Sequence, residues 1–187
     1  MSVTTLTYHE FSDCLWIRCA SRGCFVNSPA LKTISEKYLE SEGNCNIVID
    51  LEVCPGVDST FMGTLAGLAR KCMGAGGTLQ IASPTQRTRD AMESLGLDML
   101  IEIDPIDAAW KEDISARREI LAQDTEAAVE EEHKDMTEID RTRHVLEAHN
   151  TLRSMSKKND ETFGYVCETL EEDLQRHIDM GDEPSAP

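Results

Sequence analysis

The chain has 187 residues, and its 40% hydrophobic content is enough for one packed domain with an appendage, or for two small domains. A formal net charge of -17 argues against nucleic acids and anionic membrane surfaces as partners, because phosphate binding requires a basic surface. No apolar run is long enough to span a membrane, and the first residues lack the order of a signal peptide, so we expect a cytoplasmic protein.

The N-terminal segment predicts a β-hairpin followed by a helix. Residues 5–21 break at Ser12-Asp13 into two short β-like runs. A loop, "SRGCFVNSP", follows, and Ser28-Pro29 then opens a helix, because proline has no hydrogen bond to lose in the first turn. Apolar residues at helical spacing continue this helix until Gly43 ends it.

Two further strand–helix units follow. "NIVIDL" is typical of a strand buried on both faces, and a helix over about 59–73 comes after a Pro-Gly loop. Gly63 and Gly67 lie on a common edge of that helix and indicate close packing against another backbone, since glycine is otherwise unfavourable there. "TLQIA" predicts the next strand. The helix after it begins with Ser83 as its cap and Pro84 at the first position.

The last predicted strand is "MLIEI", which completes the order β-β-α-β-α-β-α-β. Strands that alternate with helices in this way predict the α/β class: a mixed, mainly parallel sheet packed by helices, with the N-terminal strand as the exception. We place this domain at residues 1–112.

The remainder of the chain differs in composition. Residues 105–187 carry 10 basic and 22 acidic side chains, against 8 and 13 in residues 1–104. Apolar residues at intervals of three and four predict a helical extension over 113–180, either an antiparallel hairpin or helices that pair between chains. A break at Lys157-Lys158 suits a turn, with Asn159 or Asp160 as the cap of the last helix. Residues 181–187 are expected to be a disordered tail.

Few residues in this sequence suggest catalysis. The glycine-rich "GAGG" follows a helix rather than a strand, so it does not fit a dinucleotide site. The seven cysteines show no zinc spacing and are interpreted as small buried hydrophobes. The five histidines lie in mostly polar surroundings and are interpreted as surface residues: His9, His133, His144, His149 and His177. We therefore expect no metal site and no cofactor.

The stretch "VDSTFMG" is the exception, and it has two interpretations. Asp58, Ser59 and Thr60 directly precede a helix, where a side-chain oxygen caps a free backbone N–H and contributes about 1 kcal/mol. A serine at that position is also exposed at the carboxyl edge of a parallel sheet, where ligands and partners dock. A phosphate there would be tolerated by the helix dipole and would add charge to a binding surface.

The segment 46–103 resembles the STAS domain of anti-sigma factor antagonists, and the likeness extends over about residues 3–110. The matching features are a strand ending in Asp50-Leu51, a short loop, Asp58-Ser59-Thr60 opening a helix with small residues, a glycine-rich turn, a short strand, and a helix ending in "LGL". Members commonly read Asp-Ser-Ser-Gly-Leu, whereas this chain has Phe61 in place of the usual small residue.

The resemblance implies a partner-switching protein that is not an enzyme. Such a domain binds a serine kinase that is also an anti-sigma factor, and it thereby frees the sigma factor. The kinase uses its own ATP to phosphorylate one serine, here Ser59 with Thr60 as a secondary acceptor, and a serine phosphatase reverses the modification. The implied partner-binding residues are Asp58, Ser59, Thr60, Phe61, and Gly23 and Asn27 of the loop before the first helix, which we expect beside the acceptor helix.

Two alternatives remain open at this stage. The chain could be a constitutive STAS scaffold that forms a homodimer through its C-terminal helices and is never phosphorylated. It could also be an enzyme that uses a cysteine or Ser59 in thiol or hydrolytic chemistry, although the sequence shows no base at a recognisable position.

Overall fold

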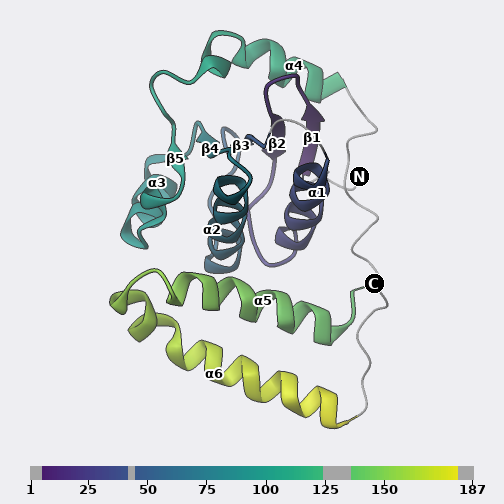
Figure 1. Cartoon of the computed structure of the whole chain (residues 1–187), viewed down its shortest axis with the longest axis vertical. Coiled ribbons are helices and arrows are strands. Elements are labelled where there is room, and N and C mark those ends of the chain that lie inside the picture. Colours follow the sequence, from purple (N-terminus) through teal and green to yellow (C-terminus); the bar gives the residue numbers. More distant parts are fainter. Residues whose placement is uncertain (1–5, 42–44, 124–135, 181–187) are drawn as a thin grey trace.

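The structure is a computed structural model that describes residues 6–41, 45–123 and 136–180. Its centre is a five-stranded sheet in the order β1-β2-β3-β4-β5 (Figure 1). The strands are β1 (Leu6–Glu10), β2 (Leu15–Cys19), β3 (Ile47–Asp50), β4 (Leu79–Ala82) and β5 (Glu102–Ile103). β1 pairs antiparallel with β2, and every other pair is parallel. The predicted mixed α/β fold, with the N-terminal strand as the exception, is confirmed.

Helices cover both faces of the sheet because its strands are apolar on both faces. In β3, Ile47 and Ile49 belong to the larger core, while Val48 between them belongs to a second core on the opposite face. The larger core packs against α1 (Ser28–Glu40), α2 (Ser59–Gly74) and α3 (Gln86–Ser94). The second core packs against η2 (Ala109–Glu112) and α4 (Ile114–Gln123). A short η1 (Leu97–Met99) precedes β5.

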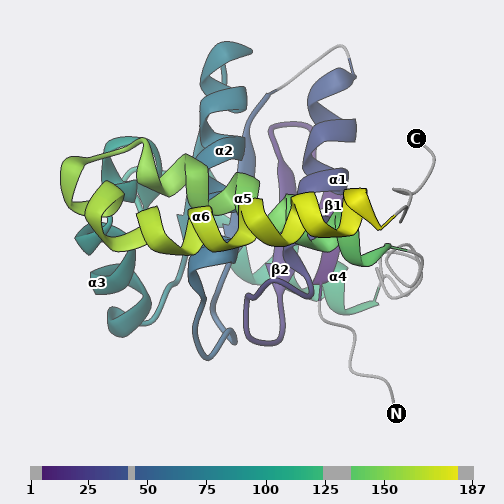
Figure 2. The same ribbon diagram turned by 90° about the horizontal axis from the view of Figure 1, so that it is seen from below.

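The C-terminal extension forms a helical hairpin that packs on this chain's own helices. α5 (Glu138–Arg153) and α6 (Lys157–Asp179) run across α2 on the side away from the sheet (Figures 1 and 2). Leu152, Phe163 and Cys167 join the larger core, so the hairpin is a third layer of the same core. The predicted pair of helices is present, whereas the tail at 181–187 lies outside the described residues.

Two helix starts differ from the sequence prediction. Thr85, not Ser83, caps α3, because its hydroxyl accepts from the Thr88 N–H at 3.2 Å. Ser156 caps α6 through the Asn159 N–H, so Asn159 lies inside the helix. The Asn159 amide instead donates to the carbonyls of Leu95 and Leu152, at 3.0 Å each. Tertiary hydrogen bonds therefore decided the role of both predicted caps.

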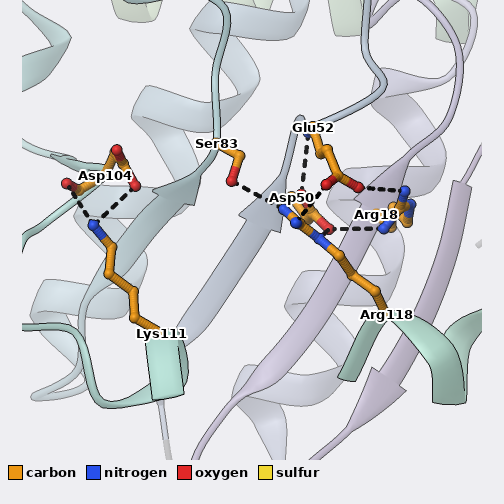
Figure 3. A network of polar contacts seen from close by, with 7 residues as sticks. All are labelled: Arg18, Asp50, Glu52, Ser83, Asp104, Lys111 and Arg118. Atoms are coloured by element: carbon orange, nitrogen blue, oxygen red, sulfur yellow. Dashed lines mark hydrogen bonds and ion pairs between the residues drawn. The ribbon is translucent and has the colours of Figure 1, made fainter. Parts of the chain in front are cut away.

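A network of charged side chains fastens α4 to the carboxyl edge of the sheet (Figure 3). Asp50 is fully buried and accepts from Arg118 at 2.8 Å on both oxygens and from Arg18 at 3.2 Å. Arg118 also pairs with Glu52 at 2.6 Å and donates to the hydroxyl of Ser83 at 2.9 Å. Ser83 has a φ of 51°, a conformation unusual for a non-glycine residue. This side of the molecule is thus held by paired charges.

Candidate functional site

Ser59 is the first residue of α2, at the edge of the sheet where the parallel strands end. The residue before it, Asp58, has an extended backbone and caps the helix, since its Oδ1 accepts from the Phe61 N–H at 2.8 Å. The predicted helix cap is therefore confirmed. The cap leaves the Ser59 hydroxyl free to make contacts outside the first turn.

The loop before α1 lies beside this helix start, as the sequence predicted. Gly23 forms a bridge with Val57, and the Asp58 N–H donates to the Gly23 carbonyl at 2.9 Å. The Phe25 N–H donates to Asp58 Oδ2 at 3.2 Å. The carboxylate of Asp58 therefore caps α2 with one oxygen and holds the loop with the other.

The predicted partner-binding residues differ in their accessibility. Ser59 and Asp58 are half-buried, whereas Thr60 and Gly23 are buried and Phe61 is completely so. A Cβ on Gly23 would come within 2.9 Å of the Phe61 ring, so glycine allows the loop to lie flat on this aromatic residue. In this conformation Phe61 is a core residue, and Thr60 does not present its hydroxyl to a kinase.

Asn27 is also buried, and it organises the loop. Its Oδ1 accepts from the Cys24 N–H at 2.8 Å, and its Nδ2 donates to the Arg22 carbonyl at 3.0 Å. The exposed apolar side chains of the loop are Phe25 and Val26, at 54% and 63%. Neither residue was among the predicted partner-binding residues, although two consecutive apolar residues in a loop are a sequence signal for a contact surface.

The extension supplies a partner for Ser59 that the sequence analysis missed. The Ser59 Oγ lies 2.9 Å from Nε2 of His149 on α5. The other ring nitrogen, Nδ1, lies 2.8 Å from the Val145 carbonyl, which can only accept. Nδ1 therefore carries the proton, and Nε2 accepts from the Ser59 hydroxyl.

A second histidine makes a similar contact one turn earlier in α5. His144 Nε2 lies 2.8 Å from the Ser28 hydroxyl and 3.4 Å from that of Thr64. Both His144 and His149 are buried, so their interpretation as surface residues was wrong. Their spacing of five residues gave no sequence signal, because the hydroxyl partners lie about a hundred residues away in the chain.

The contact between Ser59 and His149 places a base beside a hydroxyl. A cavity of about 30 Å³ lies between α1, α2 and α5, near His144 and Thr64. Ser59 is not among its lining residues, and the volume holds one or two water molecules. The hydrogen bond with His149 positions the serine hydroxyl, and this small cavity is no substrate site for it.

Four thiols of the domain, Cys14, Cys19, Cys54 and Cys72, are enclosed, whereas Cys24 of the loop is half-buried. Cys19 and Cys54 are buried, and their mutual hydrogen bond raises the pKa of Cys19 and lowers that of Cys54. Burial raises the pKa of Cys14 and of Cys72 to about 12. A buried thiol with a raised pKa is a poor nucleophile, which argues against thiol chemistry at Cys14, Cys19 and Cys72.

Ligand sites of other kinds have little support in the described part of the chain. Among residues 6–41, 45–123 and 136–180, no group of three or more His, Cys, Asp or Glu side chains is placed to hold a metal ion. Within the same ranges, no helix combines the length and the apolar character that crossing a membrane requires.

Comparisons with known proteins agree with this architecture. A solved structure of an anti-sigma factor antagonist from Thermotoga maritima matches with a TM-score of 0.50 and 19% identity, over 60% of this chain and 94% of that chain. An anti-sigma factor antagonist from Mycobacterium paratuberculosis matches with a TM-score of 0.49 and 19% identity, over 61% and 93%. Unphosphorylated SpoIIAA, a Bacillus anti-sigma factor antagonist, gives 0.48 and 15%, over 60% and 97%.

At these identities the likeness to solved structures concerns the fold. No curated protein sequence matches the chain significantly. The model of the STAS domain family matches residues 5–111, which include every strand of the sheet and the first three helices. The helical hairpin α5–α6 lies beyond the matched residues. The chain belongs to the STAS domain family.

Proposed function

We propose that this protein is a phosphorylation-regulated binding module and not an enzyme. It acts as an anti-sigma factor antagonist in a cytoplasmic partner-switching pathway. Its unmodified form binds a serine kinase that is also an anti-sigma factor, and a serine phosphatase acts on the phosphorylated form. The modified residue is Ser59, whereas Thr60, the secondary acceptor expected from the sequence, is buried and is not part of the proposal. The chain needs no cofactor of its own, because the ATP is bound by the kinase.

One observation carries this proposal: a serine hydroxyl at the start of α2, beside a loop that presents exposed apolar side chains. Asp58, the residue before Ser59, joins the first turn of α2 to the loop, because its two carboxylate oxygens accept from the N–H groups of Phe61 and Phe25. Phosphate added there lies at a helix N-terminus, which the helix dipole favours, and it adds about -1.5 to -2 charges next to the loop. A partner that contacts Phe25 and Val26 would sense that change directly.

The test is phosphorylation by the serine kinases encoded in the same genome. The full chain is incubated with each kinase and ATP, and modified residues are mapped by mass spectrometry. We expect one kinase to modify Ser59 and to bind the unmodified chain more tightly than the phosphorylated chain. Ser59→Ala should abolish the modification. Phosphate found at other residues and never at Ser59 would refute the assignment.

The scaffold alternative makes a different prediction about association. It requires the C-terminal helices to pair between chains, with Ser59 never modified. The apolar residues Ile139 and Leu152 of α5 and Phe163 of α6 are already buried within one chain, which favours the regulated module over this alternative. Light scattering on the full chain distinguishes them, because the scaffold predicts a stable dimer at micromolar concentration.

A further inference from the structure

The extension covers the residue that the proposed function assigns as the phosphate acceptor. His149 is buried against α2, and its Nε2 accepts from the Ser59 hydroxyl at 2.9 Å. Its Nδ1 is fixed by the Val145 carbonyl, so the ring cannot rotate without losing a second hydrogen bond. A kinase that needs the Ser59 oxygen has to displace this ring.

α5 is seated too closely on α2 for the ring to move aside alone. A Cβ on Gly63, one turn after Ser59, would lie 2.2 Å from the Ala148 carbonyl oxygen. The two helix backbones therefore touch next to His149. On the flank towards α1, Glu147 forms an ion pair with Lys32 at 2.5 Å, and His144 contacts Ser28 at 2.8 Å. Moving α5 outward at Ser59 breaks these contacts together.

A phosphate on Ser59 conflicts with this arrangement in charge and in hydrogen bonding. The kinase transfers the γ-phosphoryl group of ATP: an Oγ–P bond forms, the bond to the β-phosphate breaks, ADP leaves, and the hydroxyl proton passes to a base of the kinase. The ester oxygen then has no proton to donate to Nε2 of His149, so the hydrogen bond of the unmodified chain is lost. About -1.5 to -2 charges also enter a half-buried position beneath α5, where water screens them less than at an open surface.

We propose that the docked hairpin α5–α6 and a phosphate on Ser59 exclude each other. Docking protects Ser59 from the kinase, and phosphorylation releases the hairpin from α2. By thermodynamic linkage, docking of the hairpin disfavours phosphorylation by the same free energy by which phosphorylation disfavours docking. Release uncovers Leu152, Phe163 and Cys167 together with the outer face of α2, so the phosphorylated chain presents an apolar surface that the unmodified chain buries.

This inference rests on Ser59 as the modified residue, but its test needs no kinase. The full chain is made with phosphoserine encoded at position 59, and hydrogen exchange is followed by mass spectrometry. Peptides from α5 and α6 should exchange at least about tenfold faster than in the unmodified chain, while β3 and β4 keep their protection. Ser59→Ala removes the hydrogen bond without adding charge, so its α5 peptides should change by less than about tenfold.

Two glycine variants provide a second route to the released state. In Gly63→Ala the new Cβ meets the Ala148 carbonyl, so α5 should exchange faster with Ser59 unmodified. Gly67→Ala is the matched control, because a Cβ at that position of the same helix meets nothing within 4 Å. Its α5 peptides should exchange as in the parent chain.

The outcomes separate this inference from the proposed function. If α5 of the phosphoserine chain keeps or gains protection, the hairpin and the phosphate are compatible, and the inference is wrong whichever kinase exists. If the hairpin is released but no kinase modifies Ser59, the coupling stands and the proposed function fails. If Gly63→Ala also loses protection in β3 and β4, the substitution has disturbed the whole domain. The phosphoserine chain is then the measurement that tests the coupling between the phosphate and the docked hairpin.

Discussion

Two helical layers, α4 on one face of the sheet and the hairpin α5–α6 on the outer side of α2, are attached by different chemistry. On one face, α4 is held by guanidinium–carboxylate pairs: Arg118 with the buried Asp50, and Arg117 with Asp13 at 2.9 Å. On the other side, α5 meets α2 through neutral contacts, an imidazole on a hydroxyl and a backbone carbonyl on Gly63. One attachment is made by buried charges, whereas the contact of α5 with α2 is made by neutral groups, with the exposed ion pair between Glu147 and Lys32 at its flank.

This difference decides which layer a new charge can detach. A buried ion pair is costly to break, because each partner left behind is a desolvated charge. A neutral hydrogen bond contributes only about 0.5–1.5 kcal/mol, and it is lost when the donor is esterified. We therefore expect α4 to be a permanent part of the domain and the hairpin to be the layer that responds to modification.

The largest expected effect is at the charged attachment. Asp50→Ala leaves Arg18 and Arg118 without their shared buried partner and should lower the free energy of unfolding by about 3 kcal/mol. Urea denaturation at neutral pH measures the loss. The control is Glu52→Gln, since Glu52 pairs with the same arginines but is 41% exposed, and it should cost less than about 1 kcal/mol. Equal losses in the two variants would show that burial is not what makes this network strong.

The contrast between the layers also separates what the sequence could predict from what it could not. The strands and the first three helices follow from local apolar patterns and from Pro and Gly positions, and the Asp58 cap follows from a local rule. The pairing of Ser59 with His149 joins residues on separate elements, so no local pattern contains it. A glycine at position 63 indicated a close backbone contact, but the sequence could not identify Ala148 as the residue in contact.

The next largest effect concerns the anchoring of the hairpin at its turn. Asn159→Ala removes the amide that donates to the carbonyls of Leu95 and Leu152, and the Leu152 carbonyl keeps the Met155 N–H. We expect a loss of about 1–3 kcal/mol and faster hydrogen exchange in α6, with β3 unchanged. Asn150→Ala on the exposed side of α5 is the matched control and should change neither measurement. A uniform loss of protection across the sheet would argue that the hairpin cannot separate from the domain.

A smaller effect measures the neutral contacts directly. Ser28 and His144 form the second hydroxyl–imidazole pair between the hairpin and the domain. A double-mutant cycle with Ser28→Ala and His144→Ala should give a coupling of about 1 kcal/mol in urea denaturation. The same cycle on Asp50 and Arg118 should give a larger coupling. A smaller coupling for the charged pair would reverse the comparison between the two layers.

The smallest expected effect is the acid sensitivity of the α4 attachment. The hydrogen bonds from Arg117 hold the pKa of Asp13 below its usual value. Its stabilisation is therefore complete above the unfolded pKa of about 3.9 and is lost as the pH falls through the folded pKa. Asp13 is 43% exposed, so the stability difference between the parent chain and Asp13→Asn should stay below about 1 kcal/mol. Urea midpoints at pH 6, 5, 4 and 3.5 should show that difference constant down to about pH 5 and shrinking below about pH 4. If the stability difference between the two chains instead grows as the pH falls, Asp13 stabilises α4 in its protonated form. The ion pair of Asp13 with Arg117 would then not be what attaches α4.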